Sequence, residues 1–168
     1  MYKVKCYKTR HKLEEAVKIV PAWDTGIELD ESIDFLDTRE IVKIMCSDNI
    51  AIHENTTEFS YLVCLNEAGQ MTGIAEISKG NMKASYVSPV DALQHAILLN
   101  SRYVVMVHNH PNKVLEASDG DLEVAKTLLK AFDAVHIYFL DSIIIGEKNQ
   151  SYSIHSNYPE IWDENEKL

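Results

Sequence analysis

The residues of this sequence best suited to chemistry are two histidines one position apart, His108 and His110, followed further along the chain by the carboxylate of Asp121. Imidazole nitrogens and carboxylate oxygens are common zinc ligands, and a zinc ion held by three protein groups keeps one coordination position open. An open position can bind a water molecule and activate it for hydrolysis. The pattern therefore predicts a three-ligand metal site of the catalytic type.

The local sequence also predicts how the two histidines are presented. The apolar run 103–107 is typical of a strand buried on both faces, and it leads directly to His108. Residues at positions i and i+2 of a strand face the same way, about 6.6 Å apart, so both imidazoles can converge on one ion. Pro111 lacks an amide hydrogen and fixes φ, which ends the strand directly after the pair.

The third ligand is predicted to lie in the first turn of the following helix. Ser118 and Asp121 have the spacing of a capping box, in which each side chain bonds the other residue's amide. A capped first turn would hold the Asp121 carboxylate rigidly, so a capping role and a ligand role are compatible. Asp119 is the second choice, because it lies beside the cap rather than one turn into the helix.

A hydrolytic metal site also requires a group that accepts a proton from the water. Glu76 is a candidate, because it lies in an apolar segment predicted to be a strand, where a buried carboxylate is costly. The alternative interpretation places Glu76 on the exposed face of a β-hairpin. The histidine pair could likewise be structural, although its setting beside a proline and before an acidic helix favours metal binding.

The remaining elements predict an α/β domain with three layers, in which helices flank a mixed β-sheet. Segment 58–79 is predicted to be a β-hairpin, and a helix from Ser88 is expected to turn Val90, Leu93, Ile97 and Leu98 to one face. Pro21 and Gly26 suggest a loop. Expected strands and helices, in chain order, are 1–7, 16–20, a helix capped at Asp37, 58–65, 71–79, a helix over 88–100, 103–107, a helix from Ser118, 135–140, 143–145 and 152–154.

We divide the chain into an N-terminal extension (1–37), a central domain (38–155) and a polar, acidic tail (156–168) that is expected to be loose. The formal net charge of −10 argues against nucleic acid or an anionic membrane as the main partner. Three widely spaced cysteines fit a reducing compartment. The N-terminus lacks the apolar run of a signal peptide, and no segment is long and apolar enough to span a membrane, so a cytoplasmic location is expected.

The chemical residues together resemble the JAMM motif of the JAB/MPN metalloenzymes, which is a Glu, then H-x-H-P, then S-x-x-D. The HNHP form resembles the RadC family, as do the segments 75–80 and 141–146, and the resemblance covers about residues 38–155. RadC-like chains usually have Ser-Gly after HNHP, and here these positions hold Asn112 and Lys113.

This resemblance implies a cytidine-deaminase-like architecture and a function. It implies that His108, His110 and Asp121 bind Zn²⁺, that Glu76 is the general acid/base, and that Ser118 donates a hydrogen bond to the oxyanion. The implied reaction is hydrolysis of a peptide or isopeptide bond, with a peptide or protein conjugate as substrate.

Two alternatives are weighed against this interpretation. A RadC-like chain could instead be a non-catalytic accessory module in DNA repair or mobile-element biology, with a structural metal or none. Deaminase chemistry is disfavoured, because it requires H-x-E with P-C-x-x-C and no such cysteine pair is present. Exposed strand edges leave a homodimer open.

Overall fold

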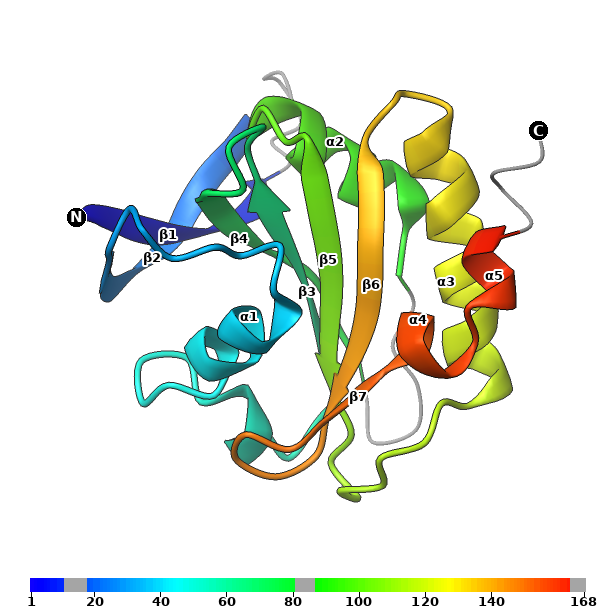
Figure 1. Cartoon of the computed structure of the whole chain (residues 1–168). Helices are drawn as coiled ribbons and strands as arrows, with labels where there is room; N and C mark the ends of the chain where they lie inside the picture. Colours follow the sequence, from blue (N-terminus) through cyan, green and yellow to red (C-terminus); the bar gives the residue numbers. More distant parts are fainter. Residues whose placement is uncertain (11–17, 81–86, 164–168) are drawn as a thin grey trace.

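A computed structural model describes residues 1–10, 18–80 and 87–163 of the chain. Seven strands form one sheet in the order β2-β1-β4-β3-β5-β6-β7 (Figure 1). The elements are β1 (Tyr2–Arg10), β2 (Lys18–Leu29), α1 (Thr38–Met45), the 3₁₀ turn η1 (Ile52–Glu54), β3 (Phe59–Leu65), β4 (Met71–Lys79), α2 (Pro89–Leu98), β5 (Tyr103–Asn109), α3 (Asp119–Asp133), β6 (Tyr138–Ile145), β7 (Ser151–Ser153), α4 (Ile154–Asn157) and α5 (Glu160–Asp163).

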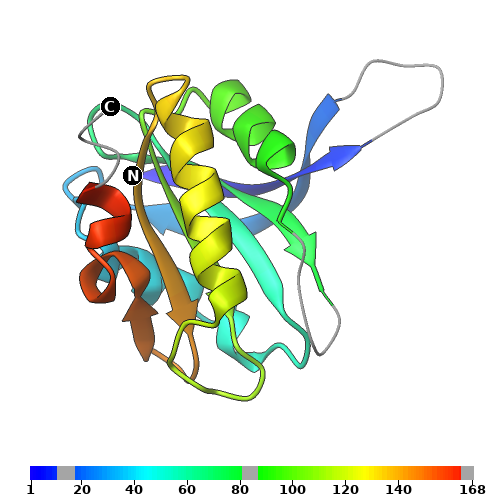
Figure 2. The ribbon, with the colours of Figure 1, turned by 90° about the vertical axis from the view of Figure 1, so that its right-hand side faces the viewer.

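The sheet is mixed, as the sequence predicts. β1 pairs with β4 and β5 pairs with β6 in parallel, and every other neighbouring pair is antiparallel. α1 covers one face of the sheet, and α2, α3 and the C-terminal helices cover the other (Figures 1 and 2). This arrangement confirms the three-layer α/β architecture.

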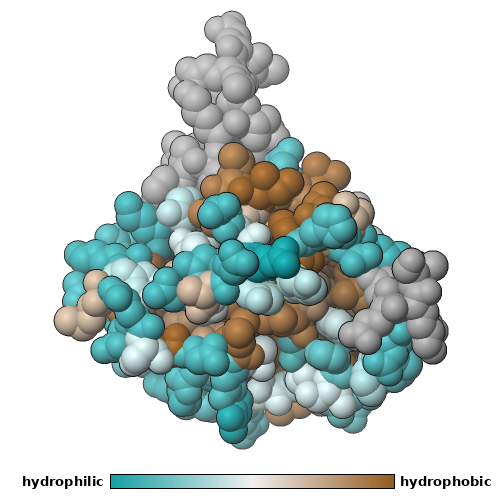
Figure 3. Space-filling view, turned by 45° about the horizontal axis from the view of Figure 1, so that its top comes forward, coloured by the Kyte–Doolittle hydropathy of each residue, from teal (hydrophilic) through white to brown (hydrophobic). Residues whose placement is uncertain are grey.

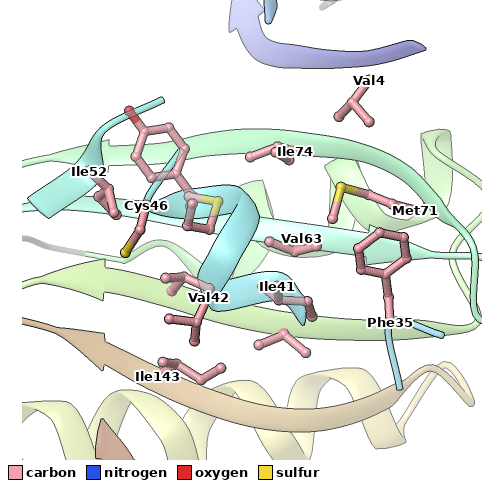
Figure 4. Close-up of a cluster of buried hydrophobic side chains, with 14 of the residues drawn as sticks. Val4, Phe35, Ile41, Val42, Cys46, Ile52, Val63, Met71, Ile74 and Ile143 are labelled. Carbon is pink, nitrogen blue, oxygen red and sulfur yellow. The ribbon is translucent and has the colours of Figure 1, made fainter. Parts of the chain in front are cut away.

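Each face of the sheet buries its own hydrophobic cluster. Below α1, the fully buried side chains include Phe35 and Ile41, which pack with Val63 and Ile143 of the sheet (Figure 4). On the opposite face, side chains of α3 pack against strand residues such as Leu62. Burying one such side chain contributes about 1.5–3 kcal/mol, so both helical layers are needed to stabilise the central strands.

The predicted helix starts are confirmed where a polar residue caps the first turn. Asp37 accepts a hydrogen bond from the Arg39 amide at the start of α1. Ser88 caps α2, and Pro89 occupies its first turn, where the missing amide hydrogen costs nothing. These signals are local in sequence, which is why they predict the boundaries well.

Two expectations for the chain ends are wrong. The segment around Pro21 and Gly26 is not a loop but part of β2, which forms one edge of the sheet. Proline is tolerated there because an edge strand has an unpaired side. The described part of the expected loose tail, residues 156–163, is not loose either: it completes α4 and forms α5, and the Trp162 indole donates to the Phe139 carbonyl at 2.7 Å.

The expected apolar face of α2 is wrong for three of its four residues, since only Leu93 is partly buried against the core. Val90, Ile97 and Leu98 are exposed, whereas Ala92, His95 and Ala96 are buried. The small alanine side chains allow α2 to lie close to the sheet, and the three exposed apolar residues are on the part of the helix that faces solvent. Figure 3, viewed from the side where α2 lies, shows hydrophobic atoms gathered on an otherwise mostly hydrophilic surface. Among the described residues, no helix is long and apolar enough to cross a bilayer.

Candidate metal centre

Three side chains converge where β5 ends and α3 begins. The Nε2 atoms of His108 and His110 lie 3.3 Å apart. The two Asp121 carboxylate oxygens lie 3.2 Å from His108 Nε2 and 3.5 Å from His110 Nε2. Ligands that bind zinc tetrahedrally at about 2.0–2.1 Å are themselves about 3.3–3.4 Å apart. These three groups could therefore hold one metal ion without a large rearrangement.

Both histidines present Nε2 to the same point. His108 lies in β5, and His110 directly follows the strand with its amide bonded to the Ile145 carbonyl of β6. Because the two histidines alternate with Asn109, both rings turn to one face of the sheet. The Nδ1 atom of His110 lies 2.8 Å from the Val114 carbonyl, and a carbonyl can only accept a hydrogen bond. Nδ1 therefore carries the proton, and the lone pair of Nε2 is free to bind a metal.

Asp121 is held by the predicted capping box. Its Oδ2 accepts hydrogen bonds from the Ser118 amide at 2.8 Å and the Ser118 hydroxyl at 2.7 Å, and its own amide donates to Ser118 Oγ. Burial acts to raise the pKa of Asp121, but the neighbouring imidazoles of His108 and His110 and the hydrogen bonds from Ser118 hold the pKa well below its usual value. The carboxylate is therefore ionised at neutral pH, as a metal ligand must be.

The three groups lie in a cavity of 370 Å³, and one further carboxylate, Glu58, lines it. Glu58 immediately precedes β3 and is partly buried. Burial raises the pKa of Glu58, which is partly offset by the charges of His108 and His110. A carboxylate with a raised pKa is suited to accept and return a proton near neutral pH. The cavity is lined by Glu58, Ser60, Val87, Met106, His108, His110, Pro111, Asn112, Ser118, Gly120, Asp121, Val124 and Ser142.

This geometry agrees with a comparison against known protein families. The family model of the RadC-like JAB domain matches residues 35–158, which is most of the chain. This chain is a member of the RadC-like JAB domain family. The family resemblance inferred from HNHP and S-x-x-D is thereby confirmed.

Individual relatives of this RadC-like chain are named UPF0758 protein, a name that states no activity. The protein from Finegoldia magna is 32% identical over 74% of this chain and 54% of its own length. The protein from Chlorobium phaeovibrioides is 32% identical over 63% of this chain and 47% of its own length. The Vibrio cholerae protein is 27% identical over 74% of this chain and 84% of its own length. The chain thus spans about half the length of the first two relatives.

The RadC-like fold does not bring Glu76 to the metal centre. Glu76 pairs with Tyr61 across the β3–β4 ladder, whereas His108 pairs with Ser60 on the β3–β5 ladder. Because adjacent strand residues face opposite sides, Glu76 and His108 lie on opposite faces of the sheet. Burial and, to a smaller extent, the negative charge of Glu76 raise the pKa of the Tyr61 hydroxyl and of the Cys6 thiol. Both residues belong to the core below α1.

Glu58 is the functional candidate that sequence reasoning missed. It lies two residues before Ser60, so strand alternation places it on the face of His108. The available signal was an acidic residue at the start of a predicted apolar strand. To assign Glu58 to the site from this signal, one would need to know how β3 aligns with β5, and the local sequence does not determine that alignment.

The loop between the histidines and α3 departs from the usual RadC-like sequence at Lys113. This residue has φ of 63°, in the left-handed region that favours glycine, which is the residue that the resemblance to RadC-like chains implies here. Its ammonium group donates to the carbonyls of His53 and Gly146. These two hydrogen bonds tie the loop to η1 and to the end of β6, which offsets the less favourable backbone conformation.

Proposed function

We propose that this RadC-like domain is a zinc-dependent hydrolase of the JAMM type, which cleaves a peptide or isopeptide bond. The observation that carries the proposal is the mutual spacing of His108 Nε2, His110 Nε2 and the Asp121 carboxylate, 3.2 to 3.5 Å. That spacing matches tetrahedral zinc ligands, and a fourth ligand is lacking among the described residues of the group.

The mixed nitrogen and oxygen ligand set favours zinc, which imidazole and carboxylate groups both bind well. A zinc ion bound there would polarise a carbonyl oxygen and lower the pKa of a coordinated water to about 7. The three cysteines are buried and unpaired, which agrees with a reducing cytoplasm.

The chain's own residues supply the remaining chemistry. Glu58 accepts the proton of the attacking water and later returns it to the leaving amine, because it lines the same cavity as the ligands and has a raised pKa. Ser118 presents a hydroxyl at the cavity wall. Its proton is donated to Asp121 Oδ2, and it would turn from that oxygen to the substrate to stabilise the developing oxyanion. The cavity is partly open, and Gly120 and Val124 of α3 form part of its wall, so a peptide segment is expected to reach the ligands from solvent.

The test compares two glutamates that lie on opposite faces of the sheet. Glu58→Gln removes the proton acceptor, so cleavage of a peptide and isopeptide library is expected to fall at least about 10²-fold. Glu76→Gln is the matched control, and we expect its cleavage rate to equal that of the wild-type protein. Library products are measured by mass spectrometry, and zinc content by elemental analysis.

Both variants are expected to retain about one zinc per chain, since neither changes a ligand. Loss of cleavage in Glu76→Gln, with Glu58→Gln active, would reverse the assignment of the two glutamates. A zinc-loaded wild-type protein that cleaves nothing in the library would contradict the hydrolase proposal and favour a non-catalytic RadC-like module.

A further inference from the structure

Asn109, the middle residue of the HNHP motif, has no place in the chemistry described above. It lies on β5 between His108 and His110, so its side chain points away from the metal centre, toward the opposite face of the sheet. The residue is completely buried. A buried amide side chain is stable only if its hydrogen-bonding groups find partners.

All the partners of the Asn109 side chain come from the segment that carries Glu58. Its Oδ1 accepts a hydrogen bond from the Phe59 amide at 2.8 Å. Its Nδ2 donates to the Thr57 carbonyl at 3.1 Å and to the Asn55 carbonyl at 3.4 Å. The two orientations of the amide are not interchangeable, because the Phe59 amide can only donate and the carbonyls can only accept.

These bonds replace main-chain pairing where that pairing stops. The ladder between β3 and β5 ends at Ser60 and His108, so the residues before Ser60 have no main-chain partner on β5. On the other side, the Glu58 carbonyl accepts from the Gly80 amide at 2.8 Å. Asn109 therefore provides the link between the Glu58 segment and the strand that carries both histidines.

We propose that Asn109 is a positioning residue, which sets the location of the Glu58 carboxylate relative to the metal ligands by holding the residues on both sides of it. The proposal rests on the proposed function, in which Glu58 is the general acid/base. The end of β5 and the residue after it thus supply two ligands on one face of the sheet, and Asn109 between them supports the segment of the proton acceptor.

The chemistry of the partners explains why asparagine fits this position. Aspartate would keep an acceptor for the Phe59 amide, but it would place a carboxylate oxygen against the Thr57 and Asn55 carbonyls without a donor. Alanine would leave one amide and two carbonyls without their partner. Leucine has a similar shape but lacks both polar functions, so it separates hydrogen bonding from packing.

The experiment uses Asn109→Ala and Asn109→Leu in the full chain, with Asn66→Ala as the matched control. Asn66 accepts hydrogen bonds from the Ala68 and Gln70 amides at the other end of β3, far from the ligands. Amide hydrogen exchange of metal-free protein is measured at Phe59, with Val63 as the internal reference. Zinc affinity and, separately, kcat and KM are then determined for each variant.

In both Asn109 variants we expect Phe59 amide protection to fall about tenfold relative to Val63. We expect zinc affinity to change less than about threefold, and kcat to fall about 10²-fold with KM nearly unchanged, as for a displaced catalytic group. Asn66→Ala should leave all these quantities at wild-type values.

The exchange and zinc measurements do not depend on activity, so they separate this proposal from the proposed function. Unchanged Phe59 protection would overturn the positioning role even in an active enzyme. Loss of zinc affinity in parallel with kcat would also overturn it, because Asn109 would then act through the histidines. A wild-type protein without activity but with the expected exchange pattern would reject the proposed hydrolase, and with it any catalytic consequence of the Asn109 contacts.

Discussion

At the scale of single residues, two of the three candidate ligands, His110 and Asp121, are held by hydrogen bonds from outside the ligand group. The Val114 carbonyl binds His110 Nδ1, and Ser118 donates twice to Asp121. Such partners fix the protonation and direction of a ligand before a metal arrives. The ligands are therefore preorganised, and little conformational entropy has to be lost when an ion binds.

Ser118 caps α3 and is also the proposed oxyanion donor, and two different measurements report these two roles. Ser118→Ala removes the N-cap of α3 and is expected to lower the free energy of unfolding by about 1 kcal/mol. It also removes the proposed oxyanion donor, so kcat should fall about 10²- to 10³-fold. Ser118→Thr keeps the hydroxyl and the cap and should retain most of both. Urea titration and peptide cleavage measure the two effects, and an alanine variant with full activity would remove Ser118 from the chemistry.

Residue spacing in the sequence predicts that His108, His110 and Asp121 form a group, because local structure sets the direction of each of these side chains. Two residues apart on a strand and three residues after a helix cap are both short-range patterns. Glu58 was not predicted, since its approach to the histidines depends on how β3 aligns with β5. That register is set by tertiary contacts between segments about 50 residues apart.

At the scale of elements, α2 shows how a helix can bury its smaller face. Ala92 and Ala96 are completely buried against the sheet and α3, while Ile97 and Leu98 point to solvent. Apolar periodicity alone predicts the opposite face, because it weights large side chains most heavily. The narrow space between α2 and the sheet, rather than the size of the apolar side chains, determines which face of α2 is buried.

A pair of substitutions on α2 tests this orientation. Ala96→Leu inserts bulk into a filled interface and is expected to cost about 1–3 kcal/mol of unfolding free energy. Leu98→Ala removes a side chain that is 65% exposed, so the change should stay within about 0.5 kcal/mol. Both values come from urea unfolding. A cost of about 2–5 kcal/mol for Leu98→Ala would indicate that this residue is buried in the core after all.

Helix caps and the β3–β4 hairpin could be predicted, whereas β2 and the C-terminal helices could not. The hairpin turn has its own signal in Asn66, whose side chain accepts two amides, and in Gly69 with φ of 74°. β2 contains Pro21, which reads as a loop unless the strand is known to lie at an edge. The short α4 and α5 depend on packing against β6 and α3 rather than on their own periodicity.

At the scale of the whole molecule, the candidate metal centre joins elements that are far apart along the chain. β3, β5 and α3 all contribute to its cavity. The two strands contribute side chains to both hydrophobic clusters, and α3 contributes to the cluster on its own face of the sheet. An ion bound by β5 and α3 would therefore cross-link the sheet to the helical layer. Binding to the folded state alone must stabilise that state.

Metal binding is accordingly expected to raise thermal stability. At free zinc about 1,000 times its Kd, linkage predicts a gain of about 4 kcal/mol. For a chain of this size this gain raises Tm by about 10 °C. Asp121→Asn loses the ionised ligand and should show a much smaller increase. Differential scanning calorimetry with zinc or with chelator measures the shift, and an equal increase in Asp121→Asn would place the stabilising ion elsewhere.

The most direct test is diffraction at the zinc absorption edge from crystals grown with zinc. We predict one anomalous peak about 2.0–2.1 Å from His108 Nε2, His110 Nε2 and an Asp121 oxygen, with the Glu58 carboxylate facing the fourth position. Crystals that contain zinc but show no peak among these three side chains would contradict the account, as would a fourth protein ligand that closes the site.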